Sequence, residues 1–414
     1  MKIAVFDHVG NFGGGSRFSR ALLLALRKNF PDTHITFFGR RSSIAREDIY
    51  EEFAAAGIKV NYFSSLDPTK FTHKIICILL TVVNKFLKHL GLDSLFRNGI
   101  HKEIKILSHG YDLAFFPWPY LIECPSLNCP MVGVFHDFNF KYFFGSPIFS
   151  ETQYHEINRQ MIDWLEQAKP IVSSQFIASE LAKFYPAVAS KVEIVHLAPF
   201  TISHIKNSES HEIIKKLAIN RPYILYPTNL CCHKNLGILF RAIFLLRQEE
   251  IKVTLVITGP NTKSVTGMVS ANGIERSTTE YADVIGLGYV SNLQIDALIQ
   301  NATAVISTSL YEAGNGPGLD AWSRGVPVIM SDIPAFSEHL SVLGVKAQLI
   351  DPYDAKDIAK KIQFVLTNYD QAKEGALQSL ESLNNCTWEK VATQYHKIFC
   401  NLVQKYQQPI SQRD

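Results

Sequence analysis

Short apolar runs alternate with helix-length amphipathic stretches along most of the chain. Between residues 18 and 26, apolar side chains recur at i, i+3, i+4, i+7 and i+8, which predicts a helix soon after the first apolar run. The runs that predict strands are 2–7, 34–39, 58–63, 112–117, 131–136, 170–174 and 192–196, followed by 223–227, 252–258, 284–286, 302–308, 326–331 and 347–350. Repeated strand–helix units favour parallel, doubly wound sheets, so the predicted fold class is α/β.

The length of the chain predicts two domains. It has 414 residues, which is long for a single hydrophobic core. The stretch 201–220 is polar and carries charges of both signs, which predicts a linker between a first domain over 1–200 and a second over 221–385. The tail, 386–414, has the pattern of an amphipathic helix up to about residue 405.

Composition excludes several classes of protein. The hydrophobic and charged fractions, 47% and 19%, are those of an ordinary soluble protein. A net charge of +3 and the lack of an RNA-binding signature argue against nucleic acid as a partner. Seven scattered cysteines fit a reducing compartment better than a disulfide framework. The first residues lack a signal-peptide pattern, and the longest apolar run, 75–83, is too short to span a bilayer. We therefore expect a cytoplasmic protein.

The stretch 70–105 is basic and amphipathic. It carries seven Lys and Arg residues against two acids, with apolar side chains between them. Such a stretch can lie on an anionic membrane surface and bring the first domain to a membrane-held acceptor, so peripheral contact with the inner face of a membrane is one interpretation. Core helices with solvated outer faces explain the same pattern, and the residues alone leave both interpretations open.

One of the strand–helix–strand units contains a loop with an acid at each end. Glu312 and Asp320 flank a segment rich in Gly and Pro, which follows the apolar run 304–307 and precedes the run 326–330. Such a loop leaves the carboxyl end of a parallel strand, where open α/β sheets bind ligands. Its glycines allow backbone N–H groups to approach a phosphate, and its carboxylates accept hydrogen bonds from hydroxyls. The pattern favours a nucleotide sugar, although a capped turn without a ligand also places an acid at a helix start.

This loop resembles the E-x7-E signature of the retaining glycosyltransferases of family 4, with Asp320 in place of the second Glu. Other landmarks of the family occur in the expected order: the glycine loop 13–15, His136-Asp137, 223–227 with 233–235, 255–260, 288–291, 331–332 with Glu338, and Trp388. The resemblance covers nearly the whole chain. It implies the GT-B fold, in which two Rossmann-like doubly wound parallel-sheet domains face a central cleft and the C-terminal helix crosses back to the N-terminal domain.

The resemblance also implies roles for individual residues. Lys234, which precedes a helix, would neutralise the leaving diphosphate, and Glu312 would hold hydroxyls of the donor sugar. Asp320 would hold the ribose, and His136 would bond a sugar hydroxyl or stabilise an oxocarbenium ion. The other donor-binding residues are Asn229, where the family usually has Arg, and Gly314, Asn315, Gly316, Gly318, Leu319, Tyr289 and Val290; Gly13, Gly14, Gly15 and Arg17 form a phosphate or acceptor loop.

The activity implied by the resemblance is retaining transfer of a hexose, mannose or glucose, from a nucleoside diphosphate sugar to a hydroxyl of a glycan or lipid-linked acceptor. This would place the enzyme in polysaccharide or lipopolysaccharide biosynthesis. No D-x-D motif occurs in the chain, so we expect no metal on the diphosphate and no cofactor. Two alternatives remain open. A non-catalytic GT-B protein would bind a nucleotide or glycan, and a sugar-nucleotide epimerase on the same fold would release no sugar to an acceptor.

Overall fold

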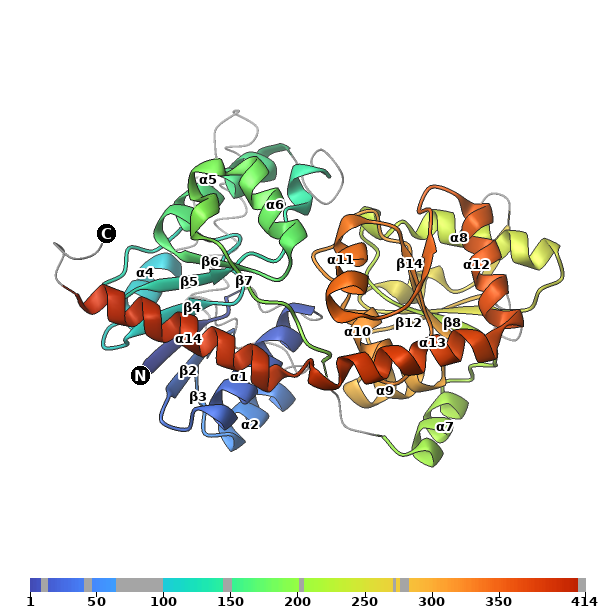
Figure 1. Ribbon diagram of the computed structural model, residues 1–414, viewed down its shortest axis with the longest axis horizontal. Coiled ribbons are helices and arrows are strands. Elements are labelled where there is room, and N and C mark those ends of the chain that lie inside the picture. Colours follow the sequence, from blue (N-terminus) through green and yellow to red (C-terminus); the bar gives the residue numbers. More distant parts are fainter. Residues whose placement is uncertain are drawn as a thin grey trace. The chain divides into compact units, whose positions relative to one another are not determined.

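The chain divides into two compact units (Figure 1). A computed structural model describes residues 1–8, 14–40, 47–64, 100–143, 151–200, 205–270, 273–275 and 283–408. The first unit comprises Met1–Leu197 and Trp388–Asp414, and the second comprises Ala198–Thr387. Gly13 and most of the basic stretch 70–105 lie outside the described residues. Within those described ranges, no helix is both long enough and apolar enough to cross a membrane.

A seven-stranded parallel sheet forms the centre of the first unit, in the order β3-β2-β1-β4-β5-β6-β7. The strands are β1 (Lys2–Phe6), β2 (His34–Gly39), β3 (Lys59–Tyr62), β4 (Leu113–Phe116), β5 (Met131–Val134), β6 (Lys169–Val172) and β7 (Glu193–Ile194). Every residue of β4 and β5 is buried, as expected for strands covered on both faces. The predicted strands are confirmed, and most differ from the observed ones only at their ends.

Helices connect these strands, and the last helix of the chain packs against the first. They are α1 (Gly14–Asn29), α2 (Glu47–Ala55), α4 (Ile100–Leu107), α5 (Glu151–Gln167), α6 (Gln175–Phe184) and α14 (Trp388–Gln407). Phe18 of α1 meets Trp388 of α14 edge-on, with ring centroids 5.9 Å apart. Asn29 Nδ2 also donates to the carbonyl of Glu389 at 2.8 Å. The tail is therefore an amphipathic helix whose apolar face covers α1.

The second unit has a six-stranded parallel sheet in the order β12-β9-β8-β13-β14-β15. Its strands are β8 (Tyr223–Pro227), β9 (Thr254–Thr258), β12 (Val284–Gly288), β13 (Ala304–Ser307), β14 (Val328–Ser331) and β15 (Gln348–Ile350). Its helices are α7 (Asn207–Lys216), α8 (Leu236–Gln248), α9 (Asn292–Asn301), α10 (Gly316–Trp322), α11 (Pro334–Leu343), α12 (Ala355–Thr367) and α13 (Tyr369–Ser382). A short antiparallel pair, β10 (Met268–Ser270) and β11 (Gly273–Glu275), forms a separate two-stranded sheet.

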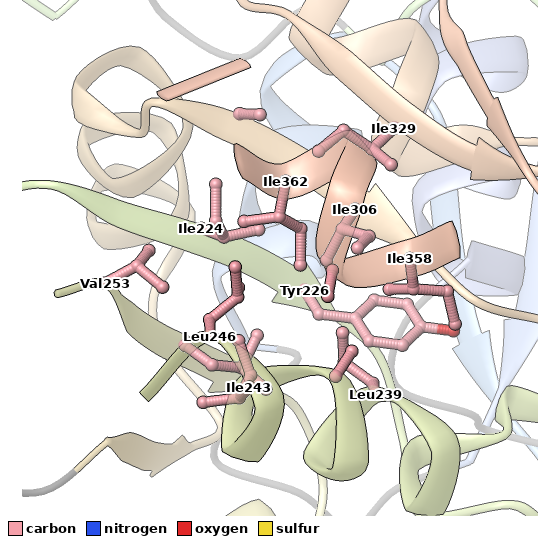
Figure 2. Packing of buried hydrophobic residues seen from close by; sticks show 14 of the residues in the cluster. Ile224, Tyr226, Leu239, Ile243, Leu246, Val253, Ile306, Ile329, Ile358 and Ile362 are labelled. Carbon is pink, nitrogen blue, oxygen red and sulfur yellow. The ribbon is translucent and has the colours of Figure 1, made fainter. Parts of the chain in front are cut away.

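One face of this sheet is covered by α8 and α12 (Figure 2). Leu239, Ile243 and Leu246 recur along α8 at helical spacing and are buried against the sheet. Ile358 and Ile362 of α12 close the same cluster. Burial of large aliphatic side chains contributes roughly 1.5–3 kcal/mol each, so this layer fixes the position of the strand ends that carry the site.

The stretch 201–220, predicted to be a linker, contains a helix. Residues 207–216 form α7, which packs on α9, and Asn301 Nδ2 of α9 donates to Ser210 Oγ of α7 at 3.0 Å. Residues from Ala198 onward belong to the second unit. The linker prediction is therefore wrong for α7, which the polar composition of this stretch concealed.

The strand orders give each sheet one switch point at its carboxyl edge. In the first unit the chain order reverses between β1 and β4, and in the second unit it reverses between β8 and β13. Ligands of open α/β sheets bind in the crevice that such a reversal leaves. Each unit therefore offers one place where a site is expected.

Candidate active site

Lys234 and Glu312 meet at the switch point of the second unit. Lys234 ends the 3₁₀ turn Cys232–Lys234 that follows β8, and Glu312 follows β13. The Lys234 Nζ lies 2.5 Å from Glu312 Oε1, and the two side chains are 16% and 18% exposed. Residues 78 positions apart are thus brought together by the pairing of β8 with β13.

A chain of hydroxyl groups orients Glu312. The Ser309 hydroxyl donates to Glu312 Oε1 at 2.6 Å. The Tyr226 hydroxyl lies 2.9 Å from Ser309 Oγ and 3.1 Å from the carbonyl oxygen of Lys234, to which it can donate. Ser309 is fully buried, as is most of Tyr226. Within the described part of the chain, Oε1 receives both hydrogen bonds, and Oε2 has no partner. The carboxylate therefore keeps one oxygen available to accept from a ligand.

The ion pair keeps Lys234 charged despite its burial. Burial by itself lowers the pKa of Lys234, but the Glu312 carboxylate and the hydrogen bond that it accepts outweigh this, so the pKa is raised. An ammonium group has three donors, and among the described residues only Glu312 accepts from Nζ. Lys234 can therefore present both charge and hydrogen-bond donors to an anion.

His233 belongs to the same cluster, although no role was predicted for it. Its side chain is buried, and burial, together with the positive charge of Lys234, lowers its pKa to about 4. The imidazole is therefore neutral at physiological pH. The sequence signal was its position beside Lys234, but burial is what makes it a neutral neighbour of the ion pair.

The loop after Glu312 uses two of its predicted donors internally. Asn315 caps α10, since its Oδ1 accepts from the N–H of Gly318 at 2.9 Å and its carbonyl accepts from the N–H of Leu319 at 2.9 Å. A Cβ at position 318 would lie 2.3 Å from Asn315 Nδ2, so this cap requires Gly. The N–H groups of Gly318 and Leu319 thus donate to Asn315 in this structure, and their role as ligand donors stays a prediction. Those of Gly314, Asn315 and Gly316 have no partner in the described chain.

The carboxylate of Asp320 has a backbone partner within the second unit. It is fully buried in α10, and its Oδ1 accepts from the backbone N–H of Phe200 at 3.1 Å. The ring of Phe200 in turn lies 3.4 Å from the point where a Cβ would stand on Gly316. Asp320 therefore anchors the start of the second unit against the loop, and its contact with a ribose stays a prediction.

The other predicted donor residues lie along the same edge. Asn229, after β8, is exposed and closes its own turn, because its Oδ1 accepts from the N–H of Cys231 at 3.1 Å. Tyr289, after β12, is 54% exposed, and Val290 is half-buried. Between them, Gly259 follows β9 with φ 141°, and a Cβ there would lie 1.8 Å from the carbonyl oxygen of Thr228. The turns after β8 and β9 are therefore in close contact.

The predicted residues of the first unit gather at its own switch point. His136 follows β5, and its Nε2 lies 2.8 Å from the carbonyl oxygen of Pro117, which follows β4. Burial lowers the pKa of His136 to about 4, so the ring is neutral. Gly14 is exposed at the start of α1, and Gly15 and Arg17 are half-buried in its first turns.

The sequence does not predict two further residues at this edge of the sheet. Trp118 stacks on the His136 ring with centroids 4.9 Å apart, and His8, after β1, lies 2.7 Å through Nε2 from the carbonyl oxygen of Tyr120. Burial lowers the pKa of His8 to about 4. No sequence motif marks these residues, because they are brought together by three neighbouring strands.

Comparison with known proteins assigns the second unit to a family. A family model described as glycosyl transferases group 1 matches residues 209–376, which lie within the unit that carries Lys234 and Glu312. The second unit therefore contains a domain of the group 1 glycosyltransferase type. The family expected from the acid loop and its neighbours is thereby confirmed, and the chain is an enzyme of the glycosyltransferase class.

Two relatives from Escherichia coli resemble this glycosyltransferase. O-antigen chain mannosyltransferase B is 27% identical over 291 residues, which cover 66% of this chain and 72% of the relative. The serotype-specific mannosyltransferase WbdA is 22% identical over 316 residues, which cover 72% of this chain but only 37% of WbdA.

Solved structures share the fold of the glycosyltransferase. Anabaena Alr3699/HepE, in complex with UDP and glucose, has a TM-score of 0.69 at 17% identity and covers 97% of this chain and 100% of its own. WaaG, a glycosyltransferase involved in lipopolysaccharide biosynthesis, has a TM-score of 0.63 at 12% identity, with 96% and 99% covered. These similarities establish the GT-B type of fold, with two parallel-sheet α/β units, that the sequence predicted.

Proposed function

We propose that this glycosyltransferase transfers mannose, with retention of configuration, from a nucleoside diphosphate sugar to a hydroxyl of a glycan or lipid-linked acceptor. The observation that carries the proposal is the Lys234–Glu312 pair at the switch point of the unit matched by the family. Lys234 has N–H donors that are not used by Glu312 and can bind a diphosphate. Glu312 has one carboxylate oxygen that can accept a hydrogen bond from a sugar hydroxyl. The names of the two E. coli relatives favour mannose over glucose.

The chemistry assigned to these residues is the stabilisation of a leaving group. The bond between the anomeric carbon and the diphosphate oxygen breaks, and the acceptor oxygen forms a bond to the same carbon on the same face. The acceptor proton moves to the diphosphate oxygen, so the step needs no protein base. Lys234 offsets the charge that grows on the diphosphate, and Oε2 of Glu312 accepts from a sugar hydroxyl. We propose that this proceeds without a metal ion, as the missing D-x-D motif predicts.

We assign binding roles to the other predicted residues that are exposed or have unused hydrogen-bonding groups. The exposed ring of Tyr289, beside Val290, offers a surface for the nucleotide base. The N–H groups of Gly314, Asn315 and Gly316 are the donors that the loop leaves for sugar or phosphate. His136 of the first unit, neutral and partly exposed, offers Nδ1 to a sugar hydroxyl.

A thermal-shift comparison tests the donor site. GDP-mannose, UDP-glucose and ADP-glucose are added to wild type, Lys234→Ala and Glu312→Ala, with Lys216→Ala on the exposed end of α7 as the control cation. A ligand at about a hundred times its dissociation constant stabilises the folded state by roughly 2.7 kcal/mol. We expect GDP-mannose to raise the melting temperature of wild type and Lys216→Ala, and to have little effect on the two site variants.

Product analysis then separates transfer from its alternatives. We expect labelled mannose to appear in an acceptor glycan, at an unchanged rate after treatment with EDTA. An epimerised sugar nucleotide without transfer would identify an epimerase. If no nucleotide sugar shifts the folded wild type, the transferase proposal fails and the non-catalytic alternative replaces it.

A further inference from the structure

A cavity of about 300 Å³ lies at the amino edge of the second unit's sheet. It is lined by residues at the starts of β14 and β15 and by residues of α12 and α13. The Lys234–Glu312 pair follows the carboxyl ends of β8 and β13, at the opposite edge of the same sheet. The cavity is therefore separate from the candidate active site and is not used by the chemistry assigned to it.

The lining of this cavity changes from apolar to polar toward its mouth. Apart from Gln348, the buried and half-buried lining residues carry no polar side chain: Pro327, Val328, Ala347, Phe364, Ala372 and Gly375. The exposed ones are all polar: Lys346, Gln371, Glu374 and Gln378. Pockets for small molecules combine an apolar lining with a few polar groups in this way. A volume at the lower end of their range suits a small ligand or one unit of a longer chain.

Two glutamine side chains of the cavity have hydrogen-bonding groups to offer. Gln348 belongs to β15 and Gln371 to α13, and in the described part of the chain neither amide has a hydrogen-bond partner. The third glutamine, Gln378, is used within the protein. An amide side chain offers both donors and an acceptor, which is also what a hydroxyl group requires of its partners. Gln348 and Gln371 can therefore bond a ligand that carries several hydroxyls.

The charges at the mouth of the cavity balance. Gln378 Oε1 accepts from Lys346 Nζ, and Gln378 Nε2 donates to Glu374 Oε1 at 3.4 Å. With one cation and one carboxylate in the lining, an anion such as phosphate finds no excess of positive charge. A wholly apolar ligand would exclude water from the glutamine amides without replacing its hydrogen bonds. The lining therefore fits a neutral ligand that has both hydroxyls and an apolar face, which describes a sugar ring.

The loop that precedes β15 is fixed before a ligand binds. The carbonyl of Lys346 accepts from Trp322 Nε1 of α10 at 2.8 Å, and the N–H of Lys346 donates to Ser379 Oγ of α13 at 2.8 Å. Trp322 and Ser379 are both fully buried. Because the backbone of this loop is already held by α10 and α13, binding costs little further ordering.

We propose that this cavity is a second carbohydrate site, which binds a neutral hexose unit of a glycan. The ring of Phe364 packs on the C–H face of the sugar, and the amides of Gln348 and Gln371 bond its hydroxyls. A glycan held at a second point stays at the enzyme between transfers, because its effective concentration is raised. The choice of mannose as the hexose rests on the proposed transferase function.

Hydrogen–deuterium exchange locates the site. Full-length wild type is measured alone and with α-linked mannotetraose, free mannose or inorganic phosphate. We expect mannotetraose to slow exchange at least twofold in peptides that cover 346–348 and 371–378, and phosphate to leave them unchanged. Free mannose should protect less at equal concentration, because the neighbouring rings of a glycan add contacts with the polar mouth.

Three outcomes of this experiment would overturn the proposal. No protection by mannotetraose would show that the cavity binds no such glycan. Protection by phosphate as strong as that by mannotetraose would identify an anion site. Equal protection by free mannose would assign the cavity to a free sugar and not to a glycan.

Variants with one amide removed measure the affinity at this site. The mannotetraose concentration that gives half of the maximal protection of 371–378 should rise about threefold to tenfold in Gln348→Ala and in Gln371→Ala. Gln363→Ala removes an amide of α12 that does not line the cavity, and it should keep the wild-type value. Wild-type values in both cavity variants would refute the binding role of these amides and with it the proposal.

A pair of variants at Gly375 fills the cavity to different extents. A Cβ there would make an ordinary contact with Lys346 at 3.8 Å, so the position accepts a side chain. Gly375→Leu should abolish the protection by mannotetraose, whereas Gly375→Ala adds only a methyl group and should retain it. Melting temperatures show whether both variants fold. Full protection in folded Gly375→Leu would place the glycan elsewhere and overturn the proposal.

This site and the proposed transferase function fail in different ways. The melting-temperature shift with GDP-mannose should keep its wild-type size in Gln371→Ala and Gly375→Leu, because the cavity is at the edge opposite Lys234 and Glu312. Loss of that shift in wild type would refute the transferase function, and protection of 371–378 would still be measurable. An intact shift without this protection would refute the second carbohydrate site alone.

Discussion

Ser309 shows how a single buried hydroxyl can position the acid of the site. Its Oγ donates to Glu312 Oε1 at 2.6 Å, and Ser307 Oγ lies 3.2 Å behind it without contacting Glu312. A hydrogen bond to a charged group contributes about 1.5–3 kcal/mol. We expect Ser309→Ala to lower kcat/KM on the order of tenfold to a hundredfold, because Glu312 loses its orientation.

Ser307→Ala is the matched control for this residue. It removes a buried hydroxyl of the same strand end but none of the hydrogen bonds to Glu312, so kcat/KM should change less than about threefold. Steady-state kinetics on the two variants, with folding checked by their melting temperatures, compares them directly. Equal losses in both would mean that the strand end, and not the bond to Glu312, matters.

Among the individual residues of the candidate site, the sequence predicts some and not others. Lys234 and Glu312 were predicted because their motifs are local and each follows a strand. The resemblance assigns Asp320 to a ribose, and spacing along the chain does not reveal that Asp320 is on the buried side of α10. Trp118 was missed because its environment is assembled from three strands that are distant in sequence.

The conformation of the turns after β8 and β9, at the carboxyl edge of the second sheet, depends on Gly259. Its φ of 141° is a conformation that other residues rarely adopt, and a Cβ would lie 1.8 Å from the Thr228 carbonyl oxygen. We expect Gly259→Ala to displace the turns after β8 and β9 and to lower the free energy of unfolding by about 1–3 kcal/mol. Urea denaturation at neutral pH measures this.

Replacing a second glycine, Gly375, should raise the free energy of unfolding instead of lowering it. Gly375 lies inside α13, and a Cβ there would make ordinary contacts with Lys346 at 3.8 Å. Gly375→Ala should therefore raise the free energy of unfolding, by about 0.5–1 kcal/mol, because alanine favours the helix. If Gly259→Ala were as stable as Gly375→Ala, the turn could adapt and its glycine would not be required.

The sequence predicts the buried strands more readily than the polar helix α7. The buried parallel strands are short continuous apolar runs, which the sequence shows directly. By contrast, α7 buries only Ser210 and Ile214, so its apolar face is too narrow to stand out in a polar stretch. Its packing on α9, through the bond between Asn301 and Ser210, is tertiary and leaves no local signal.

For the molecule as a whole, buried neutral histidines link stability to pH. His8 and His136 lie in the first unit and His233 in the second, and burial lowers the pKa of each from 6.5 to about 4. Above pH 6.5 these rings are neutral in both the folded and the unfolded chain. As the pH falls from 6.5 to 4, only the unfolded chain takes up the protons, so the folded state loses stability across that window.

His8→Gln isolates one of these contributions. Glutamine keeps an N–H that can reach the carbonyl of Tyr120, but its side chain does not take up a proton in this pH range. His8 is 6% exposed, and its charged neighbours are Asp7 and Arg40. Urea denaturation of wild type and His8→Gln at pH 7, 6, 5 and 4 gives the difference in unfolding free energy. We expect wild type to lose about 3 kcal/mol relative to the variant as the pH falls, since a pKa unit corresponds to about 1.36 kcal/mol. Carboxylates titrate in both proteins and cancel from this difference. A difference that stays constant with pH would show that His8 keeps its ordinary pKa in the folded chain.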